Sequence, residues 1–366
     1  MRVIGSPPTG RTSDRDDWAR AGGAFRRSTV AAPETLRETS MAEPEFAPPP
    51  LSIVVVAHNM RREIPRTLES LSAGNQRGIT RAEYEVLLVD NGSAQPFQES
   101  DFSGLELNLR CLRQPDPGVS PVGAINLGLH AARGRWIAVW IDGARMASPG
   151  LLATACEALR VSPRAVVGAR GRHLGPGVQS ETMRRGYDQE MEDRLLQQSG
   201  WRDDGYRLFG ISVFDESSGP TWFDQPTESN SLFLSRELWN ELGDYEVRFD
   251  TVGGGLVNLD TWSRALALPE VTPVVLLGEA TFHQFHGGTM TNAIDQLERW
   301  RSLCAEYEVI RGHPWSWPTA PLRWWGRFSH TPPPDELVCR FRGWHSLRKK
   351  LQRTIRRVAR AVGLRN

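Results

Sequence analysis

The sequence predicts an α/β fold with a mostly parallel central sheet flanked by helices. Near-continuous apolar segments, typical of buried parallel strands, alternate with helix-like segments from residue 51 to about residue 148. Strands that are separated by helices run parallel, with right-handed crossovers. Three of these strands end in polar residues, and ligands bind at the carboxyl ends of strands in open α/β sheets. We therefore expect a ligand site at that edge of the sheet.

The predicted elements follow one another in a regular order. Along the chain they are a strand at 51–57, a helix at 63–73, a strand at 86–89, a short strand at 109–113, a helix of small residues at 123–132 and a strand at 135–142. A later apolar strand at 274–278 comes before a His-x-x-His-Gly-Gly sequence at 283–288. A polar helical insertion around 188–193 is expected to face solvent.

The polar strand ends supply the candidate ligand-binding residues. His58 and Asn59 follow the first strand, Asp90 and Asn91 follow the second, and Asp142 ends the strand at 135–142. Several of these residues also suit a turn, because Asp and Asn favour turns whatever the function. Their shared place at one edge of the sheet favours contact with a ligand.

The two ends of the chain lie outside this pattern. Residues 1–50 lack a periodic apolar pattern and are rich in charged, Pro and Ala residues, so we predict a disordered tail. From Trp344 onwards, Arg and Lys accompany Leu, Ile and Val at helical spacing, which predicts a basic amphipathic helix within a helical, Trp-rich extension at 289–366. This helix either binds an anionic membrane surface or docks on the protein's own core.

Composition argues against several classes of protein. The sequence has no run of about 18 apolar residues, so a spanning helix is not expected. Its four cysteines are far apart and form no CxxC pair, which favours a reducing, cytoplasmic compartment, with a peripheral place on the inner membrane face as a further expectation. The net charge is only +1 and no recognition motif accompanies the basic residues, so we expect no nucleic-acid partner.

An ordered series of motifs resembles the family 2 glycosyltransferases, which have the GT-A fold. Val-Val-Ala-His-Asn at 55–59 is similar to the family's first strand, and Val-Asp-Asn-Gly-Ser at 89–93 is similar to the strand end whose aspartate holds the nucleobase. Residues 124–137 resemble the helix that comes before the metal-binding strand, and residues 229–246 resemble the segment that closes the acceptor side. The resemblance implies a GT-A-like domain at 51–288, with a nucleotide-sugar half at 51–148 and an acceptor half at 149–288.

The resemblance implies an inverting transfer of a sugar from a nucleoside-diphosphate sugar to a hydroxyl acceptor, such as a saccharide or lipid-linked saccharide in polysaccharide synthesis. Two family motifs are incomplete here. The metal-binding Asp-x-Asp reads Asp142-Gly-Ala144, and the Glu-Asp pair that supplies the catalytic base falls on Val257 and Asn258. The alternative function is therefore a degenerate GT-A domain that binds nucleotide sugar or glycan without catalysis.

The reaction needs a base for the acceptor proton and positive charge for the departing diphosphate. We expect Asp260 to be the base; if Asp260 instead orients its helix, Glu228 or Asp224 replaces it. The positive charge has two candidate sources. One is a Mg²⁺ or Mn²⁺ ion held by Asp142 with His283 or His286, and the other is Arg145 without a metal.

These arguments define the expected site residues. Asp142 and His286 are the expected metal ligands. His286 is preferred to His283 because the glycines that follow it let the backbone approach a phosphate. Asp260 is the expected catalytic residue. The expected substrate-binding residues are His58, Asn59, Asp90, Asn91, Asn126, Asp142, Arg145 and Glu228.

Overall fold

The structure is a computed structural model that describes residues 49–286 and 296–338. The predicted tail, except for its last two residues, and the predicted basic helix from Trp344 lie outside the described residues, and both stay predictions. Across the described residues, no helix combines the length and apolarity needed to cross a bilayer.

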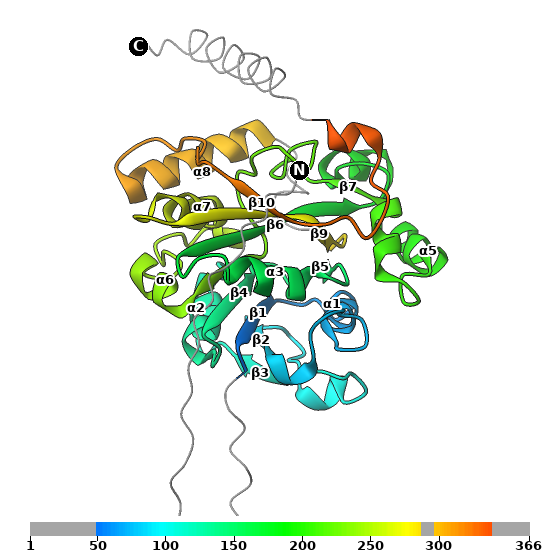
Figure 1. Ribbon diagram of the computed structural model, residues 1–366. Helices are drawn as coiled ribbons and strands as arrows, with labels where there is room; N and C mark the ends of the chain where they lie inside the picture. The colour runs from blue at the N-terminus through cyan, green and yellow to red at the C-terminus, as the bar shows by residue number, and fades with distance from the viewer. Residues whose placement is uncertain (1–48, 287–295, 339–366) are drawn as a thin grey trace, which may run out of the picture. The chain divides into compact units, whose positions relative to one another are not determined.

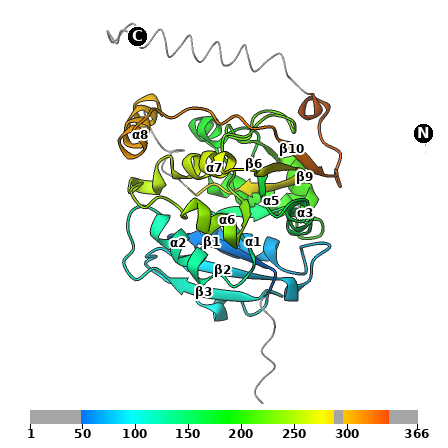
Figure 2. The ribbon, with the colours of Figure 1, turned by 60° about the vertical axis from the view of Figure 1, so that its left-hand side comes forward.

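A ten-stranded sheet forms the centre of this part of the chain (Figures 1 and 2). Its strands are β1 (Leu51–Ala57), β2 (Tyr84–Asp90), β3 (Leu109–Arg113), β4 (Trp136–Trp140), β5 (Arg145–Ala147), β6 (Ala165–Leu174), β7 (Ser212–Phe214), β8 (Leu232–Ser235), β9 (Thr272–His283) and β10 (Arg323–Gly326). The order across the sheet is β10-β9-β6-β8-β4-β1-β2-β3, with β5 added to β9 and β7 added to β6.

Five of the seven neighbouring pairs along this order are parallel. Only β8 is antiparallel to both of its neighbours, β4 and β6. The predicted mostly parallel sheet is confirmed. The predicted strand at 274–278 is longer than expected, because β9 continues to His283.

The described helices are α1 (Ile64–Leu71), α2 (Val122–Ala131), α3 (Leu151–Leu159), α4 (Gln179–Thr182), α5 (Gln189–Ser199), α6 (Arg236–Leu242), α7 (Val257–Ala267) and α8 (Gln296–Arg311). The helices predicted at 63–73 and 123–132 are confirmed within two residues at each end.

Two hydrophobic cores fill the two faces of the sheet, because successive side chains of a strand point to opposite faces. In β1, Ile53 and Val55 pack in the core that α1 and α3 cover. Val54 and Val56 pack in the core that α2, α6 and α7 cover. β1 is therefore fully buried between two layers of helices. This position determines the edge of the sheet at which the carboxyl end of β1 lies.

The insertion that carries α5 packs on the end of β9 through a third apolar cluster that includes Leu196 and Phe282. Its polar residues do not all face solvent. The Glu192 side chain is fully buried and lies 3.2 Å from Arg62 just before α1. The prediction of a solvated face is therefore wrong at Glu192, because an arginine from a distant segment pairs with this carboxylate.

Candidate active site

The polar residues at the carboxyl ends of β1, β2 and β4 come together at one edge of the sheet. In the parallel register, Ala57 at the end of β1 lies opposite Asp90, and Val55 lies opposite Trp140 at the end of β4. Asp142 follows two residues later. The edge predicted from the sequence is therefore the edge at which these side chains meet.

Asp90 presents one free carboxylate oxygen at this edge. The side chain is buried, and its Oδ1 accepts a hydrogen bond of 2.7 Å from the main-chain nitrogen of Ser93. Its Oδ2 is buried and has no hydrogen-bond partner among the described residues. The same holds for Oδ1 of the adjacent Asn91. Buried polar atoms are normally hydrogen-bonded, so these two oxygens suit a ligand that brings hydrogen-bond donors.

His58 and Asn59 brace the loop around Asp90. Nδ1 of His58 lies 2.9 Å from the carbonyl oxygen of Asn91, and the Asn59 side chain accepts a 2.9 Å hydrogen bond from the main chain of Ala94. Asn59 has a positive φ of 54°, which asparagine tolerates better than most residues. The hydrogen bonds of both side chains therefore hold the loop in place.

Asn126 has a similar bracing role on α2. Its side-chain amide donates to the carbonyl oxygen of Tyr245 at 2.9 Å and accepts from the nitrogen of the same residue at 3.1 Å. Both ends of the amide are thus engaged by one main-chain segment. The structure places Asn126 as a clamp between α2 and the segment after α6.

Asp142 meets two histidines from the end of β9. Its Oδ2 lies 2.8 Å from Nε2 of His283 and 3.2 Å from Nε2 of His286, and the two ring nitrogens are 3.1 Å apart. Oδ1 of Asp142 accepts a hydrogen bond from the main-chain nitrogen of Ala144. His283 reaches this point because β5 pairs with β9 in a register that sets Arg145 opposite His283.

The electrostatics of the three residues are coupled. Burial alone would raise the pKa of Asp142, but the neighbouring His286 imidazole above all holds it well below its usual range. Burial lowers the pKa of His283 to about 3, so its ring is neutral near pH 7. For His286, burial acts downward, but the attraction of Asp142 leaves its pKa raised.

The donor set of this triad fits a divalent cation. The three ligand atoms all lie within 4.8 Å of one another. Their separations of 2.8 to 3.2 Å are close to the distance of about 3 Å between neighbouring ligands of an octahedral ion with bonds of about 2.1 Å. Two imidazoles and a carboxylate suit Mn²⁺ and related transition metals. His283 thus joins the predicted ligands Asp142 and His286.

Main-chain contacts hold the segment that carries His286. Nη1 of Arg62 donates to the carbonyl oxygen of Phe285 at 3.0 Å, and the nitrogen of Phe285 donates to Glu192 at 2.8 Å. Arg62 and Glu192 also pair with each other. The insertion after β6 and the segment before α1 therefore jointly position the residue next to His286.

Arg145 lies beside the triad with free hydrogen-bonding capacity. The side chain is buried, and its Nε and Nη1 have no hydrogen-bond partner among the described residues. Nη1 lies 4.0 Å from Oδ2 of Asp215, a weak ion pair. Asp215 is itself held by Ser217 and Ser218, and despite burial its pKa is lowered by His173 and Arg145. An unsatisfied, buried guanidinium suits an anionic ligand group.

Glu228 is the half-buried carboxylate of this neighbourhood. Nδ2 of Asn258 at the start of α7 donates to its Oε2 at 2.8 Å, and Nδ2 of Asn230 lies 3.4 Å from its Oε1. Burial and the nearby Asp215 charge raise the pKa of Glu228. Val257 and Asn258 stand where the resemblance places the family's Glu-Asp pair, and the amide of Asn258 donates to a carboxylate from another segment of the chain.

Asp260, the expected base, lies in a different environment. It is fully buried in α7, where Arg264 donates to its Oδ2 at 2.8 Å. Arg311 at the end of α8 donates to both of its oxygens at 2.7 Å. Two arginines stabilise the charged form and occupy the oxygens that would take a proton, so this environment does not suit a catalytic base. Asp260 joins α7 to α8.

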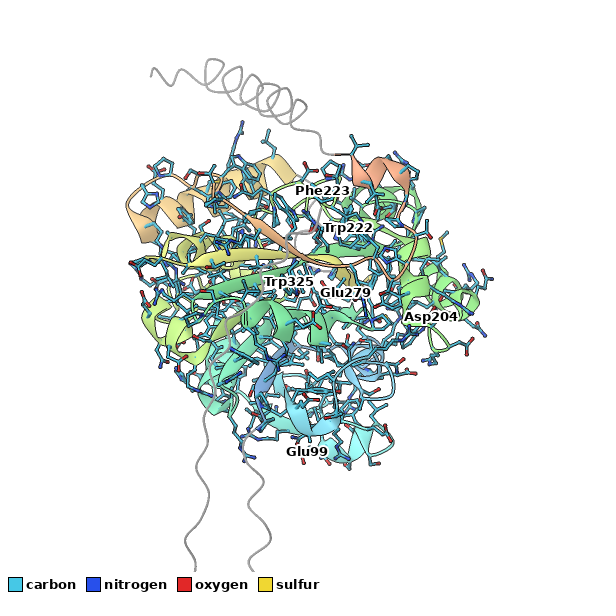
Figure 3. The ribbon with its side chains drawn as sticks, in the orientation of Figure 1. Glu99, Asp204, Trp222, Phe223, Glu279 and Trp325 are labelled. Atoms are coloured by element: carbon cyan, nitrogen blue, oxygen red, sulfur yellow. The ribbon has the colours of Figure 1, made fainter. Side chains whose placement is uncertain are left out.

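Asp224 is also engaged elsewhere. Its Oδ2 accepts a hydrogen bond of 2.9 Å from the nitrogen of Thr221 within its own turn. The loop from 215 to 231 is organised by the fully buried Arg170, which donates to the carbonyl oxygens of Ser218, Trp222 and Asp224. Figure 3 shows Trp222 and Phe223 of this loop beside the segment that contains β10, and Phe223 packs on Trp324 at a ring distance of 6.1 Å.

Glu336 in the 3₁₀ helix Pro334–Leu337 anchors the C-terminal segment to the same loop. Its carboxylate accepts two hydrogen bonds, at 2.8 and 3.0 Å, from the buried Arg172 and another from Nε1 of Trp222. The extension therefore supports the loop that leads to Glu228.

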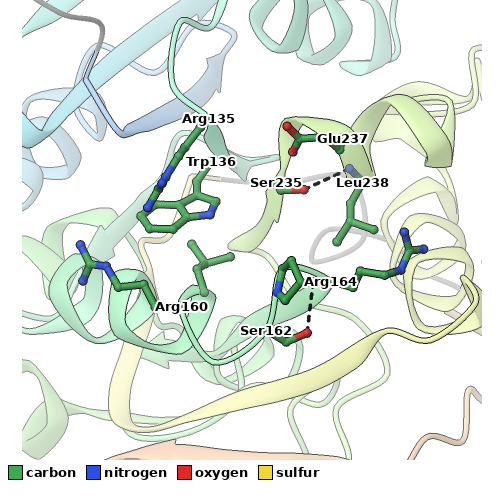
Figure 4. A pocket seen from close by; sticks show the side chains of 10 residues that line it. Arg135, Trp136, Arg160, Ser162, Arg164, Ser235, Glu237 and Leu238 are labelled. Carbon is green, nitrogen blue, oxygen red and sulfur yellow. Dashed lines mark hydrogen bonds between the residues drawn. The ribbon is translucent and has the colours of Figure 1, made fainter.

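A separate hollow lies at the amino end of β4, away from the strand ends described above (Figure 4). Its volume is about 570 Å³. The guanidinium of Arg135 stacks on the Trp136 ring, and Arg164 is paired with Glu241. The lining residues are Arg135, Trp136, Leu159, Arg160, Ser162, Pro163, Arg164, Ser235, Glu237 and Leu238.

Comparison with known proteins identifies the domain that carries the strand-end site. Residues 52–225 match the family described as Glycosyl transferase family 2. This part of the chain is a family 2 glycosyltransferase domain. The match contains Asp90, Asp142 and Arg145. Glu228 and the two histidines of the triad lie beyond it.

Two curated relatives of this glycosyltransferase match over shorter segments. The chain is 36% identical over 91 residues to chondroitin synthase of Escherichia coli, a match that covers 24% of this chain and 12% of that protein. It is 40% identical over 93 residues to the succinoglycan biosynthesis protein ExoO of Rhizobium meliloti (strain 1021), which covers 25% of this chain and 24% of that protein. The chain thus spans a quarter or less of each relative.

Solved structures of glycosyltransferases are also similar, at low identity. TarS 1-349 of S. aureus in complex with UDP-GlcNAc is 16% identical with a TM-score of 0.46, over 70% of this chain and 66% of that chain. The mannosyltransferase PcManGT of Pyrobaculum calidifontis in complex with GDP-Man and Mn²⁺ is 16% identical with a TM-score of 0.42, over 66% of this chain and 58% of that chain.

Proposed function

We propose that the chain transfers a sugar, with inversion, from a nucleoside-diphosphate sugar to a hydroxyl of an acceptor. One observation carries this proposal. Arg145 supplies positive charge, and the Asp142–His283–His286 triad supplies ligands for a cation. Glu228 supplies a half-buried carboxylate whose pKa is raised. Inverting transfer needs these two kinds of group on opposite sides of the reacting carbon.

The proposed donor site begins at Asp90. The free Oδ2 of Asp90 and the free Oδ1 of Asn91 are acceptors in a buried place at the strand ends. A nucleobase offers the ring N–H or amino donors that would satisfy them. In this proposal His58 and Asn59 hold the loop around Asp90 in place and do not contact the donor directly. Asn126 contributes through its hydrogen bonds to the main chain of Tyr245.

The proposed diphosphate site lies between the triad and Arg145. Asp142, His283 and His286 are the residues that would hold Mg²⁺ or Mn²⁺, and such an ion neutralises charge on a departing diphosphate when it is bound. Arg145 offers its buried Nε and Nη1 to a second phosphate oxygen. Ala144 stands where Asp-x-Asp has its second aspartate. In this proposal His283 at the end of β9 supplies the ligand that the alanine cannot.

The proposed base is Glu228. One of its oxygens takes the proton of the acceptor hydroxyl while the acceptor oxygen forms a bond to the anomeric carbon. The bond from that carbon to the diphosphate oxygen breaks on the opposite face, and its electron pair leaves with the diphosphate. Burial and the neighbouring Asp215 raise the proton affinity of Glu228, which suits a group that must take a proton.

The proposed acceptor is a saccharide or a lipid-linked saccharide in polysaccharide synthesis. The names of the two curated relatives, a chondroitin synthase and a succinoglycan biosynthesis protein, support this class. An anionic membrane surface remains part of the proposal through the basic segment from Trp344, which lies outside the described residues.

A screen of nucleoside-diphosphate sugars for thermal stabilisation, with and without Mn²⁺, tests the donor proposal. A true donor should raise the melting temperature through selective binding to the folded state, and more so with the ion. Donors that bind should then be incubated with oligosaccharide acceptors and the anomeric configuration of the product determined by NMR. Binding without turnover for any acceptor would favour the binding-only function, and no binding by any donor would contradict both.

A further inference from the structure

The side chain of Gln179 joins two groups of a single histidine. Gln179 begins α4 and is buried beside the last residue of β9. Its Nε2 donates to the main-chain oxygen of His283 at 3.0 Å, and its Oε1 lies 2.8 Å from Nδ1 of the same residue. The two residues are 104 positions apart in the sequence.

This pair of contacts fixes the hydrogen on the His283 ring. A carbonyl oxygen can only accept a hydrogen bond, so the amide nitrogen of Gln179 must be the atom that faces it. The amide oxygen then faces Nδ1, and because that oxygen also only accepts, Nδ1 must carry the hydrogen. Nε2 of a neutral His283 is therefore left with a lone pair.

That lone pair faces the other two ligand atoms of the triad. Nε2 of His283 lies 2.8 Å from the Oδ2 of Asp142 and 3.1 Å from Nε2 of His286. A nitrogen lone pair and a carboxylate oxygen repel each other at this distance unless a positive centre lies between them. The contact to Gln179 thus leaves Nε2 of His283 as an acceptor that faces the other two atoms of the triad.

We propose that Gln179 is a positioning residue that holds His283 in the Nδ1–H form and prepares the triad to bind a divalent transition metal without nucleotide. The inference rests on the metal site of the proposed function. Metal-binding histidines donate their other ring hydrogen to a fixed acceptor, and loss of that acceptor costs about 10- to 100-fold in metal affinity. Because the three protein atoms lie within 4.8 Å of one another, we expect the ion to bind before nucleotide.

The experiment measures two properties of the full-length chain, neither of which is turnover. The first is Mn²⁺ affinity without nucleotide, from the electron paramagnetic resonance signal of free Mn²⁺. The second is the ring tautomer of His283 in metal-free protein, from ¹⁵N shifts assigned by their loss in His283→Ala. The variants are Gln179→Leu, which removes the acceptor, and Gln179→Glu, which keeps an oxygen facing Nδ1.

Gln76→Leu serves as the matched control. Gln76 is also buried, and its Nε2 donates to the carbonyl oxygens of Ser70 and Ser148 at 2.8 and 3.0 Å. Its loss removes a comparable buried amide whose hydrogen bonds go to main-chain atoms outside the triad. Gln76→Leu should leave Mn²⁺ affinity and the His283 tautomer unchanged.

We expect His283 to be protonated at Nδ1 in the wild type, and Gln179→Leu to shift protonation toward Nε2 and weaken Mn²⁺ binding about 10- to 100-fold. Gln179→Glu should keep the hydrogen of His283 on Nδ1, since its oxygen still accepts from Nδ1 although it no longer donates to the carbonyl oxygen of His283. Unchanged tautomer and affinity in Gln179→Leu would overturn the role of Gln179, as would a His283 in Gln179→Glu that carries its hydrogen on Nε2. If the wild type binds no Mn²⁺ although His283 carries its hydrogen on Nδ1, the result would instead overturn the metal site on which the inference rests.

Discussion

Replacement of Glu279 by glutamine should change the pH dependence of folding stability. Glu279 lies in β9 (Figure 3). Its side chain is 2% exposed and accepts hydrogen bonds from Ser148, Gly150 and Tyr206. Burial raises its pKa from the usual 4.5 to about 7 in the folded protein. As the pH rises from about 4.5 to about 7, the unfolded chain loses this proton while the folded chain keeps it, so stability falls with pH across that window.

The size of the effect follows from the shift. A difference of roughly 2.5 pKa units corresponds to about 3 kcal/mol, lost progressively between pH 4.5 and 7 and constant above that. A glutamine at this position carries no ionisable group, so Glu279→Gln should gain about 3 kcal/mol relative to the wild type over the same window. Glu192, whose pKa burial also raises to about 7, contributes an equal slope to both proteins and cancels in the difference.

Urea unfolding followed by circular dichroism at several pH values from about 4.5 to about 8.5 measures this difference. Glu241→Gln is the control, because Arg164 lowers the pKa of this exposed glutamate below its usual 4.5, so its titration lies below this window and the variant's curve should run parallel to that of the wild type. Parallel curves of unfolding free energy against pH for the wild type and Glu279→Gln would refute the reasoning.

Three further predictions concern the site and its frame. Asp90→Ala should weaken nucleotide binding by about 1 to 3 kcal/mol, which calorimetry can measure, and unchanged affinity in a folded variant would remove Asp90 from the donor site. Chelation should abolish turnover, and Arg145→Lys should lower it about 10- to 100-fold, because lysine lacks the fork that pairs with two phosphate oxygens; turnover that survives the chelator would leave Arg145 as the source of charge. Asp260→Asn should lower the free energy of unfolding by about 2 to 3 kcal/mol, since it leaves Arg264 and Arg311 with a weaker partner, yet change kcat less than about threefold; a large loss of kcat in a stable variant would restore Asp260 as the base.

The sheet and the edge at which its polar strand ends meet could be predicted from the sequence, because both depend on local pattern. The apolar run before Asp90 and the run before Asp142 each mark a buried strand, and parallel strands bring their carboxyl ends together. The His-x-x-His sequence also indicates a site. The contact of His283 with Asp142 needs more information, because it depends on β9 extending to His283 and pairing with β5.

The catalytic base could not be assigned from the sequence, because the decisive contacts are distant along the chain. Along the sequence, Asp260 is the carboxylate nearest to the incomplete motif at Val257 and Asn258. Its pairing with Arg311, 51 residues later, is a tertiary contact with no local signal. The hydrogen bond from Asn258 to Glu228, across 30 residues, is of the same kind. The amide of Asn258 at the motif position is the sequence feature that could have indicated a carboxylate from another segment.

The turnover number of Glu228→Gln, with a donor and acceptor that the wild type uses, tests the central claim most directly. Glutamine keeps the size of the side chain and can still accept from Asn258, but it cannot take a proton. The account predicts a kcat at least about 100-fold below that of the wild type, with donor affinity within about twofold and with Asp260→Asn close to wild type. A Glu228→Gln protein that turns over at the wild-type rate would contradict the assignment of Glu228 as the base of this site.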